Sequence, residues 1–249
     1  MIRYDKIAED LGEEYMSRPI EYGTEADIRA RLHQILVDQL KDESQIYANV
    51  KEPRLVGDTR SYKQAYKQNI ESKLKQQGSI NRIRMDVSVD KRRQYDVVCF
   101  KDQIESPISW VRSGSKRFDE NDLEAALGIK YIKNKCYPPI RCPITDDALL
   151  EMDNTELESV FNEKENSIRN DIEDLNSLPS GVTGVFVLIS NNNYLFSEPL
   201  SAEEQGEKKK QQAGIGARRW LESFSEDVGI LYIHPYGMEW IVTCGNYSE

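Results

Sequence analysis

Asp96, Lys130 and Glu25 combine two carboxylates with one ammonium group, each in or beside an apolar segment of the sequence. Carboxylate oxygens are the ligands that hard divalent cations prefer, and a lysine ammonium donates hydrogen bonds without accepting any. Groups of this kind can hold a hydrated cation and steer one of its waters. Gly128, two residues before the lysine, brings no ligand and weakens the interior of a strand.

The arrangement resembles the metal-dependent nuclease signature of the PD-(D/E)XK superfamily. In that signature an aspartate opens one strand and an acid-x-lysine motif lies on the next. Tyr95-Asp96 stands at the first position, with tyrosine in place of the usual proline, and Gly128-Ile-Lys130 stands at the second. The resemblance implies that Asp96 is a metal ligand, that Lys130 orients or activates water, and that Glu25 is the acid of the first helix and a second metal ligand. Position 128 is then that of a missing acidic metal ligand.

The same resemblance implies an activity, a cofactor and partners. It implies hydrolysis of DNA phosphodiester bonds with Mg²⁺ or Mn²⁺, as in effectors of restriction or antiphage defence, with RNA as an alternative substrate. A homodimer or a larger defence complex fits the need to cut both strands of a duplex. The alternative function is that of a catalytically degenerate member of the fold, which binds nucleic acid or serves as the scaffold of a complex.

Gly128 leaves three explanations open. It is an introduced inactivating substitution, or it marks a naturally degenerate site, or a carboxylate has moved in from elsewhere in the chain. Glu52 and Asp86 are the residues that we consider for such a migrated ligand.

A basic cluster close to these residues is the candidate nucleic-acid contact. Its members are Arg82, Arg84, Arg92 and Arg93. Arginine side chains contact phosphate oxygens, although a solvated hairpin tip is an equally good interpretation of this cluster. The net charge of -10 argues against a protein that coats nucleic acid nonspecifically, and it is compatible with a local basic strip.

Helical spacing and strict alternation predict the elements that position these side chains. A helix is expected to begin after Thr24, an N-cap candidate, with an apolar stripe that Glu25 extends. The other expected elements, in chain order, are a short helix in 1–20, a polar helix over 59–77, strands over 83–89 and 95–101 joined as a hairpin, a short helix over 119–126, a strand over 127–133, a helix over 155–178, a strand over 184–190, a helix over 211–224 and a strand over 229–234.

This order predicts an α/β protein with a restriction-endonuclease-like core, in which a mixed central sheet is flanked by helices. We expect a single domain over 1–249, with its core over about 24–190 and a C-terminal helix-strand extension over 191–249. Other α/β domains share such an order, so the assignment depends on the site residues.

Composition and hydropathy favour a soluble, cytoplasmic protein with no membrane partner. Hydrophobic residues make up 39% of the chain, enough for a core of ordinary size. No segment approaches the roughly 18 consecutive apolar residues of a membrane span, and the N-terminus lacks the apolar stretch of a signal peptide. The sequence contains no Ser/His/Asp arrangement, Gly-rich phosphate loop or zinc-ligand spacing that stands out.

Overall fold

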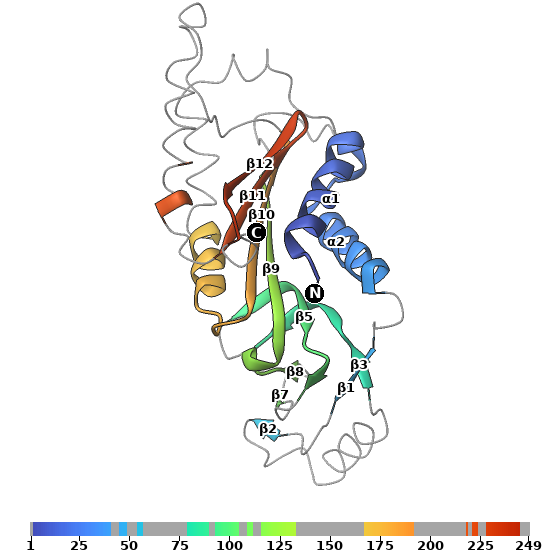
Figure 1. Ribbon diagram of the computed structural model, residues 1–249, viewed down its shortest axis with the longest axis vertical. Coiled ribbons are helices and arrows are strands. Elements are labelled where there is room, and N and C mark those ends of the chain that lie inside the picture. The colour runs from blue at the N-terminus through green and yellow to red at the C-terminus, as the bar shows by residue number, and fades with distance from the viewer. Residues whose placement is uncertain are drawn as a thin grey trace, which may run out of the picture. The chain divides into compact units, whose positions relative to one another are not determined.

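The computed structural model of the 249-residue chain describes residues 2–40, 45–48, 54–56, 79–89, 93–104, 109–111, 116–132, 167–191, 218, 221–223 and 228–244. These residues form helices and a mixed β-sheet flanked by helices, so the α/β class is confirmed. The chain divides into two compact units, and strand β9 and helix α2 each contribute residues to both (Figure 1).

Unit 1 consists of Met1–Arg31, Gly128–Ser177 and Gly184–Glu249. Its elements are α1 (Tyr4–Ser17), η1 (Pro19–Glu21), the first part of α2 (Glu25–Leu40), the second part of β9 (Leu123–Ile132), a helix at 167–176, β10 (Thr183–Ser190), β11 (Gly229–His234) and β12 (Gly237–Val242). The strands lie in the order β12-β11-β10-β9, with β11 parallel to β10 and antiparallel to β12.

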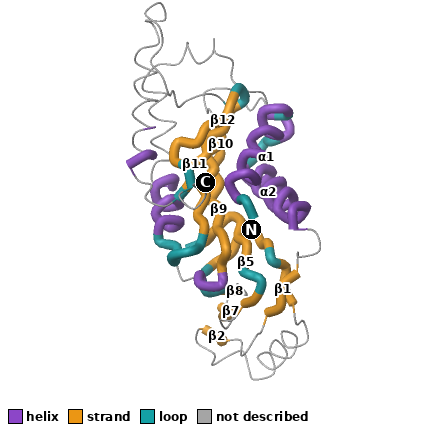
Figure 2. Tube along the Cα trace, viewed as in Figure 1, coloured by secondary structure: helices purple, strands orange, loops and turns teal. Residues whose placement is uncertain are grey.

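Helices cover both faces of β9 in unit 1 (Figure 2). The ring of Tyr131 packs edge-on against Tyr15 of α1, with 6.4 Å between the ring centroids. On the other face, a Cβ added at Gly128 would lie 3.3 Å from Cδ1 of Leu175, in the helix at 167–176. Because odd and even positions of a strand point to opposite faces, α1 and the helix at 167–176 lie on opposite sides of β9.

Helix α1 packs its apolar face on β11 and β12. The buried residues of this helix are Tyr4, Ile7, Ala8, Leu11, Gly12 and Tyr15. Gly12 allows a close approach, since a Cβ at this position would lie 2.7 Å from Sδ of Met238 and 3.3 Å from Cδ1 of Ile233. A larger residue at position 12 would therefore require the side chains of Met238 and Ile233 to shift.

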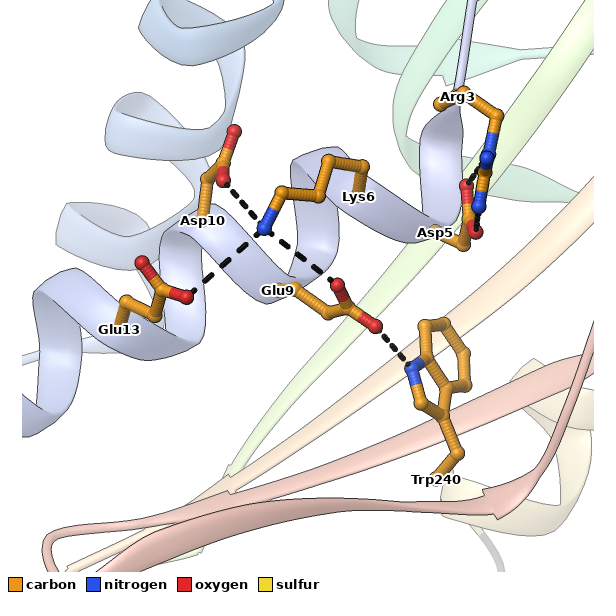
Figure 3. A network of polar contacts seen from close by, with 7 residues as sticks. All are labelled: Arg3, Asp5, Lys6, Glu9, Asp10, Glu13 and Trp240. Atoms are coloured by element: carbon orange, nitrogen blue, oxygen red, sulfur yellow. Dashed lines mark hydrogen bonds and ion pairs between the residues drawn. The ribbon is translucent and has the colours of Figure 1, made fainter.

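A polar network on the same helix adds a further contact with β12 (Figure 3). Lys6 forms ion pairs with three acids of its own helix, Glu9, Asp10 and Glu13. Glu9 also accepts a hydrogen bond of 2.9 Å from the indole nitrogen of Trp240 in β12. The network thus links the N-terminal helix to a strand near the other end of the sequence.

Unit 2 consists of Leu32–Leu127 and Leu178–Thr183. Its elements are the rest of α2, β1 (Gln45–Ala48), β2 (Arg54–Val56), β3 (Ser79–Asn81), β4 (Ile83–Ser88), β5 (Gln94–Phe100), β6 (Gln103–Ile104), β7 (Ser109–Val111), β8 (Lys116–Arg117), η3 (Glu120–Asp122) and the first part of β9. The strands lie in the order β9-β5-β4-β8-β7-β2, and β3-β1-β6 form a small separate sheet. Strand β5 is antiparallel to both of its neighbours, and Val97 to Phe100 are fully buried.

Four strand predictions are confirmed by β4, β5, β10 and β11. The predicted start of α2 is confirmed as well, because Oγ1 of Thr24 accepts a hydrogen bond of 3.2 Å from the backbone N–H of Asp27. This bond satisfies one of the N–H groups that have no partner inside the first turn of a helix.

The prediction of a helix over 119–126 is wrong. Only Glu120–Asp122 forms a single 3-10 turn, and β9 begins at Leu123. Pairing with β5, in which Leu127 lies opposite Val97, overrides the helix propensity of this Glu-, Ala- and Leu-rich stretch. The strand predicted to begin at Leu127 is the second half of a longer strand.

Several predicted segments lie outside the described residues. They include the polar helix over 59–77, the first part of the helix over 155–178, most of the helix over 211–224, and Glu52. The single domain over 1–249 and the restriction-endonuclease-like identity of its core stay predictions.

Candidate functional site on strand β9

Lys130 lies in the second half of β9 and is largely covered, with 12% of its side chain exposed. Its ammonium nitrogen lies 3.1 Å from Oδ2 of Asp171, in the helix at 167–176. A buried ammonium group needs a partner of this kind, because transfer of an unpaired charge out of water is costly. The predicted strand lysine therefore has an acidic partner from a helix and not from its own strand.

Gly128 lies on the same side of β9 as Lys130, two residues away. A Cβ at position 128 would lie 3.2 Å from Cδ2 of Phe186 in β10 and 3.3 Å from Cδ1 of Leu175. The Leu175 atom is the end of a side chain, whereas the Phe186 atom belongs to the ring of a fully buried residue, so a larger residue at 128 requires both to give way by a few tenths of an ångström. The place of the missing acid thus borders on apolar side chains.

Glu25 is half-buried at the start of α2 and reaches β9 in unit 1. Its Oε2 accepts a hydrogen bond of 3.2 Å from the backbone N–H of Tyr131, the residue after Lys130. The expectation that Glu25 faces inward from the first helix is confirmed. Carboxylates from two helices, Glu25 and Asp171, therefore bind consecutive residues of the strand that carries the lysine.

A second ionic contact holds the start of α2 in place. Glu14 of α1 accepts hydrogen bonds of 2.8 and 2.7 Å from Nε and Nη2 of Arg31, and one of 3.0 Å from the hydroxyl of Tyr22. The hydrogen bonds from Arg31 hold the pKa of the Glu14 carboxyl below its ordinary value. Burial, reinforced by the bond to Glu14, raises the pKa of Tyr22 to about 12. This contact fixes the helix that presents Glu25.

Asp96 is half-buried in β5 of unit 2. The β4 residues on either side of Asp86 pair with the β5 residues on either side of Asp96, so the two aspartates occupy opposite positions of an antiparallel pair. Asp86 has a left-handed backbone with φ of 53°, which costs energy for a residue other than glycine. Like charges at opposite positions also destabilise a strand pair. The predicted metal ligand thus lies, along the sequence of the strand pair, opposite one of the two residues considered for a migrated carboxylate.

Arg82 has partners inside the protein, and its contact with phosphate stays a prediction. It is 6% exposed, its Nε donates to the carbonyl of Phe100 at 3.0 Å, and Nη2 donates to Glu124. Nη1 forms a further ion pair of 2.6 Å with Asp102. Burial, the largest single effect, opposes the charge, but the bond to Glu124 and the nearby negative charges together outweigh it, so the pKa of Arg82 is raised above its ordinary value. The guanidinium thus joins the segment between β3 and β4 to β5 and β9 within unit 2.

The other described members of the basic cluster also have partners in the protein. The guanidinium carbon of Arg84 lies 5.5 Å from the centre of the Phe118 ring, and burial lowers the pKa of this arginine. Arg93 forms an ion pair of 2.8 Å with Glu120. Arg92 lies outside the described residues. Contact of Arg84, Arg92 and Arg93 with a nucleic acid stays a prediction.

No protein-family model, curated protein or solved structure matches this chain. Within the described ranges, no group of three or more His, Cys, Asp or Glu residues is placed to hold a metal ion. No helix in the same part of the chain is long and apolar enough to cross a membrane. The assignment of a function therefore rests on the chemistry of the residues themselves.

Asp171 and Glu124 are the interacting acids that sequence reasoning missed. Asp171 lies between Ile168 and Leu175 on the side of the helix that is buried, the same unusual placement that drew attention to Glu25. An acid inside an apolar stripe was therefore a usable signal. Glu124 gave no such signal, because it was assigned to a helix and its partner Arg82 lies 42 residues away.

Proposed function

We propose that the chain is a metal-dependent nuclease of the PD-(D/E)XK kind that hydrolyses phosphodiester bonds of DNA. The observation that carries the proposal is the surroundings of Lys130: its ammonium binds Asp171, and Glu25 binds the next backbone N–H of the same strand. A largely covered strand lysine with carboxylates nearby supports the proposal, although these carboxylates come from helices and not from the acid position of the motif. The order of α2, β4, β5, β9, a helix and β10 supports the restriction-endonuclease-like core.

The proposed cofactor is Mg²⁺ or Mn²⁺. The available donor atoms are of the right chemical type, because Asp96 and Asp86 offer carboxylate oxygens. Hard cations of this kind take such oxygens as ligands. When bound, such an ion makes a water nucleophilic near neutral pH and stabilises charge on the phosphate oxygens. The chain's own contribution is that Lys130 donates hydrogen bonds to the attacking water or to a phosphate oxygen, and that Glu25 fixes the backbone beside it. Restriction or antiphage defence, with a homodimer or larger complex, is the proposed setting.

A second candidate function is favoured by one observation. Position 128 borders on Phe186 and Leu175, so the side on which a metal-binding acid would lie is packed with apolar groups. A catalytically degenerate protein of the same fold, which binds nucleic acid or serves as a scaffold, would have this feature. It would bind DNA without cutting it.

Cleavage of supercoiled and linear DNA in Mg²⁺ and Mn²⁺ tests the two candidates. We compare the wild type with Gly128→Glu, and use Gly128→Gln as a matched control that has the same size without the charge. Lys130→Met should abolish cleavage while the folded state persists. Metal-dependent cleavage by the wild type or by the Glu variant supports the nuclease. DNA binding with no cleavage in any form would refute it and favour the second candidate.

A further inference from the structure

The acid that faces Lys130 comes from the helix at 167–176, and the same helix fills the space beside position 128. Ile168, Ile172 and Leu175 are buried on one side of this helix. Asp171 lies one turn before Leu175, whose Cδ1 is 3.3 Å from the place of a Cβ at Gly128. One helical turn therefore supplies both an apolar group against Gly128 and a carboxylate against Lys130.

The geometry points to Asp171 as the carboxylate that contacts Lys130 from the side of β9 on which position 128 brings no acid. We propose that Asp171 is a positioning residue for Lys130 in the reaction proposed above, on which this inference rests. An acid at position 128 would lie on the same side of β9 as Lys130, and Asp171 presents its carboxylate to that side from the facing helix. The wild-type chain is then competent without an acid at position 128.

The ion pair limits what the ammonium group can do. A lysine ammonium has three N–H donors, and one of them is directed to Asp171 at 3.1 Å. The side chain of Lys130 is only 12% exposed, and that of Asp171 is 35% exposed. The ion pair therefore limits the orientation of an ammonium group that the protein already largely covers. The remaining donors are thereby held in a defined direction, which is what orienting a water or a phosphate oxygen requires.

An ordinary structural ion pair is the competing explanation, since partly exposed pairs contribute little to stability. The two explanations differ in what the carboxylate does for the reaction. A structural pair affects folding alone, whereas a positioning residue affects the rate at saturating DNA. A carboxylate placed at a second position that reaches Lys130 should also restore the function of a positioning residue.

The experiment compares wild type, Asp171→Asn, Asp171→Glu and the double variant Gly128→Glu with Asp171→Asn. Glu173→Gln, an exposed acid on the same helix, is the matched control. Cleavage kinetics give kcat and KM for DNA, and mass mapping after acetylation of the folded protein reports how fast the Lys130 amine is modified. Thermal unfolding identifies any variant that fails to fold.

We expect Asp171→Asn to lower kcat about 10- to 100-fold with little change in KM. Its Lys130 amine should be acetylated about two- to fivefold faster, in line with the loss of a partly exposed ion pair. Asp171→Glu and the double variant should recover both properties, and Glu173→Gln should match the wild type. Unchanged kcat or unchanged acetylation in folded Asp171→Asn would overturn the inference.

The outcome also separates this inference from the proposed function. Cleavage by Gly128→Glu alone, with an inactive wild type, would keep the nuclease and overturn the role of Asp171. Absence of cleavage in every form would overturn both. Faster acetylation in Asp171→Asn together with wild-type kcat would assign the pair a structural role and overturn the inference.

Discussion

Replacement of Arg82 by methionine separates a structural arginine from a phosphate-binding one. The substitution keeps most of the side-chain volume and removes the hydrogen bond to the Phe100 carbonyl, worth about 1 kcal/mol. It also removes the charged bond to Glu124, worth about 1.5 to 3 kcal/mol. The pair with Asp102 adds close to nothing, because that side chain is 86% exposed. The expected loss is about 2 to 4 kcal/mol of unfolding free energy.

Urea unfolding and the salt dependence of DNA binding measure the two roles side by side. If Arg82 is structural, Arg82→Met lowers the unfolding free energy by the amount just given. The slope of log K for DNA association against log[salt] then stays unchanged. If it binds phosphate, the slope falls by about 0.9 and stability hardly changes. Arg31→Met, which breaks a pair with Glu14 and lies outside the basic cluster, is the control. A stable Arg82→Met protein with a reduced salt slope would refute the structural reasoning.

Three further predictions concern unit 1. The pKa of Tyr22 is about 12 in the folded state, above the ordinary value of 10.0. The free energy of unfolding should therefore fall as pH rises from about 10 to 12. In pH-dependent unfolding experiments, Tyr22→Phe should reduce this fall. Burial raises the pKa of Cys244 to about 11, so peptide mapping should find its thiol unmodified by a disulfide reagent at pH 8 in the folded protein and modified after denaturation. Gly229→Ala places a Cβ against Sγ of Cys244 and should cost about 1 to 3 kcal/mol in urea unfolding. Cys244→Ala in the same chain should recover part of that loss, and full additivity of the two substitutions would contradict the predicted clash.

Strands whose apolar pattern is unambiguous were predictable from the sequence. Strands β10 and β11 are continuous apolar runs, and such runs are typical of strands buried on both faces. The first half of β9 was not predictable, because Glu124 and its alanine neighbours favour a helix when no partner strand is considered. Alternation also failed within β4, where Met85 is 40% exposed and precedes the left-handed Asp86.

The candidate site was predictable in part. The inward-facing position of Glu25 followed from its place on an apolar stripe, and the contact with Tyr131 agrees with it. The partner of Lys130 was not predictable, because Asp171 is far along the chain and local pattern carries no information on which helix faces which strand. The same limit applies to Arg82, whose charge suggested a surface role although two acids neutralise it inside unit 2.

The contact between α1 and the last strands has a consequence for how the protein is synthesised. Glu9 and Trp240 are 231 positions apart, so helix α1 leaves the ribosome long before the strands against which it packs. Its apolar face, which includes Ile7 and Leu11, has no β11 or β12 to cover it until then. Contacts of such long sequence separation slow folding and leave intermediates prone to aggregation. Chains whose translation stops before residue 229 should therefore depend on chaperones far more than the full-length protein does.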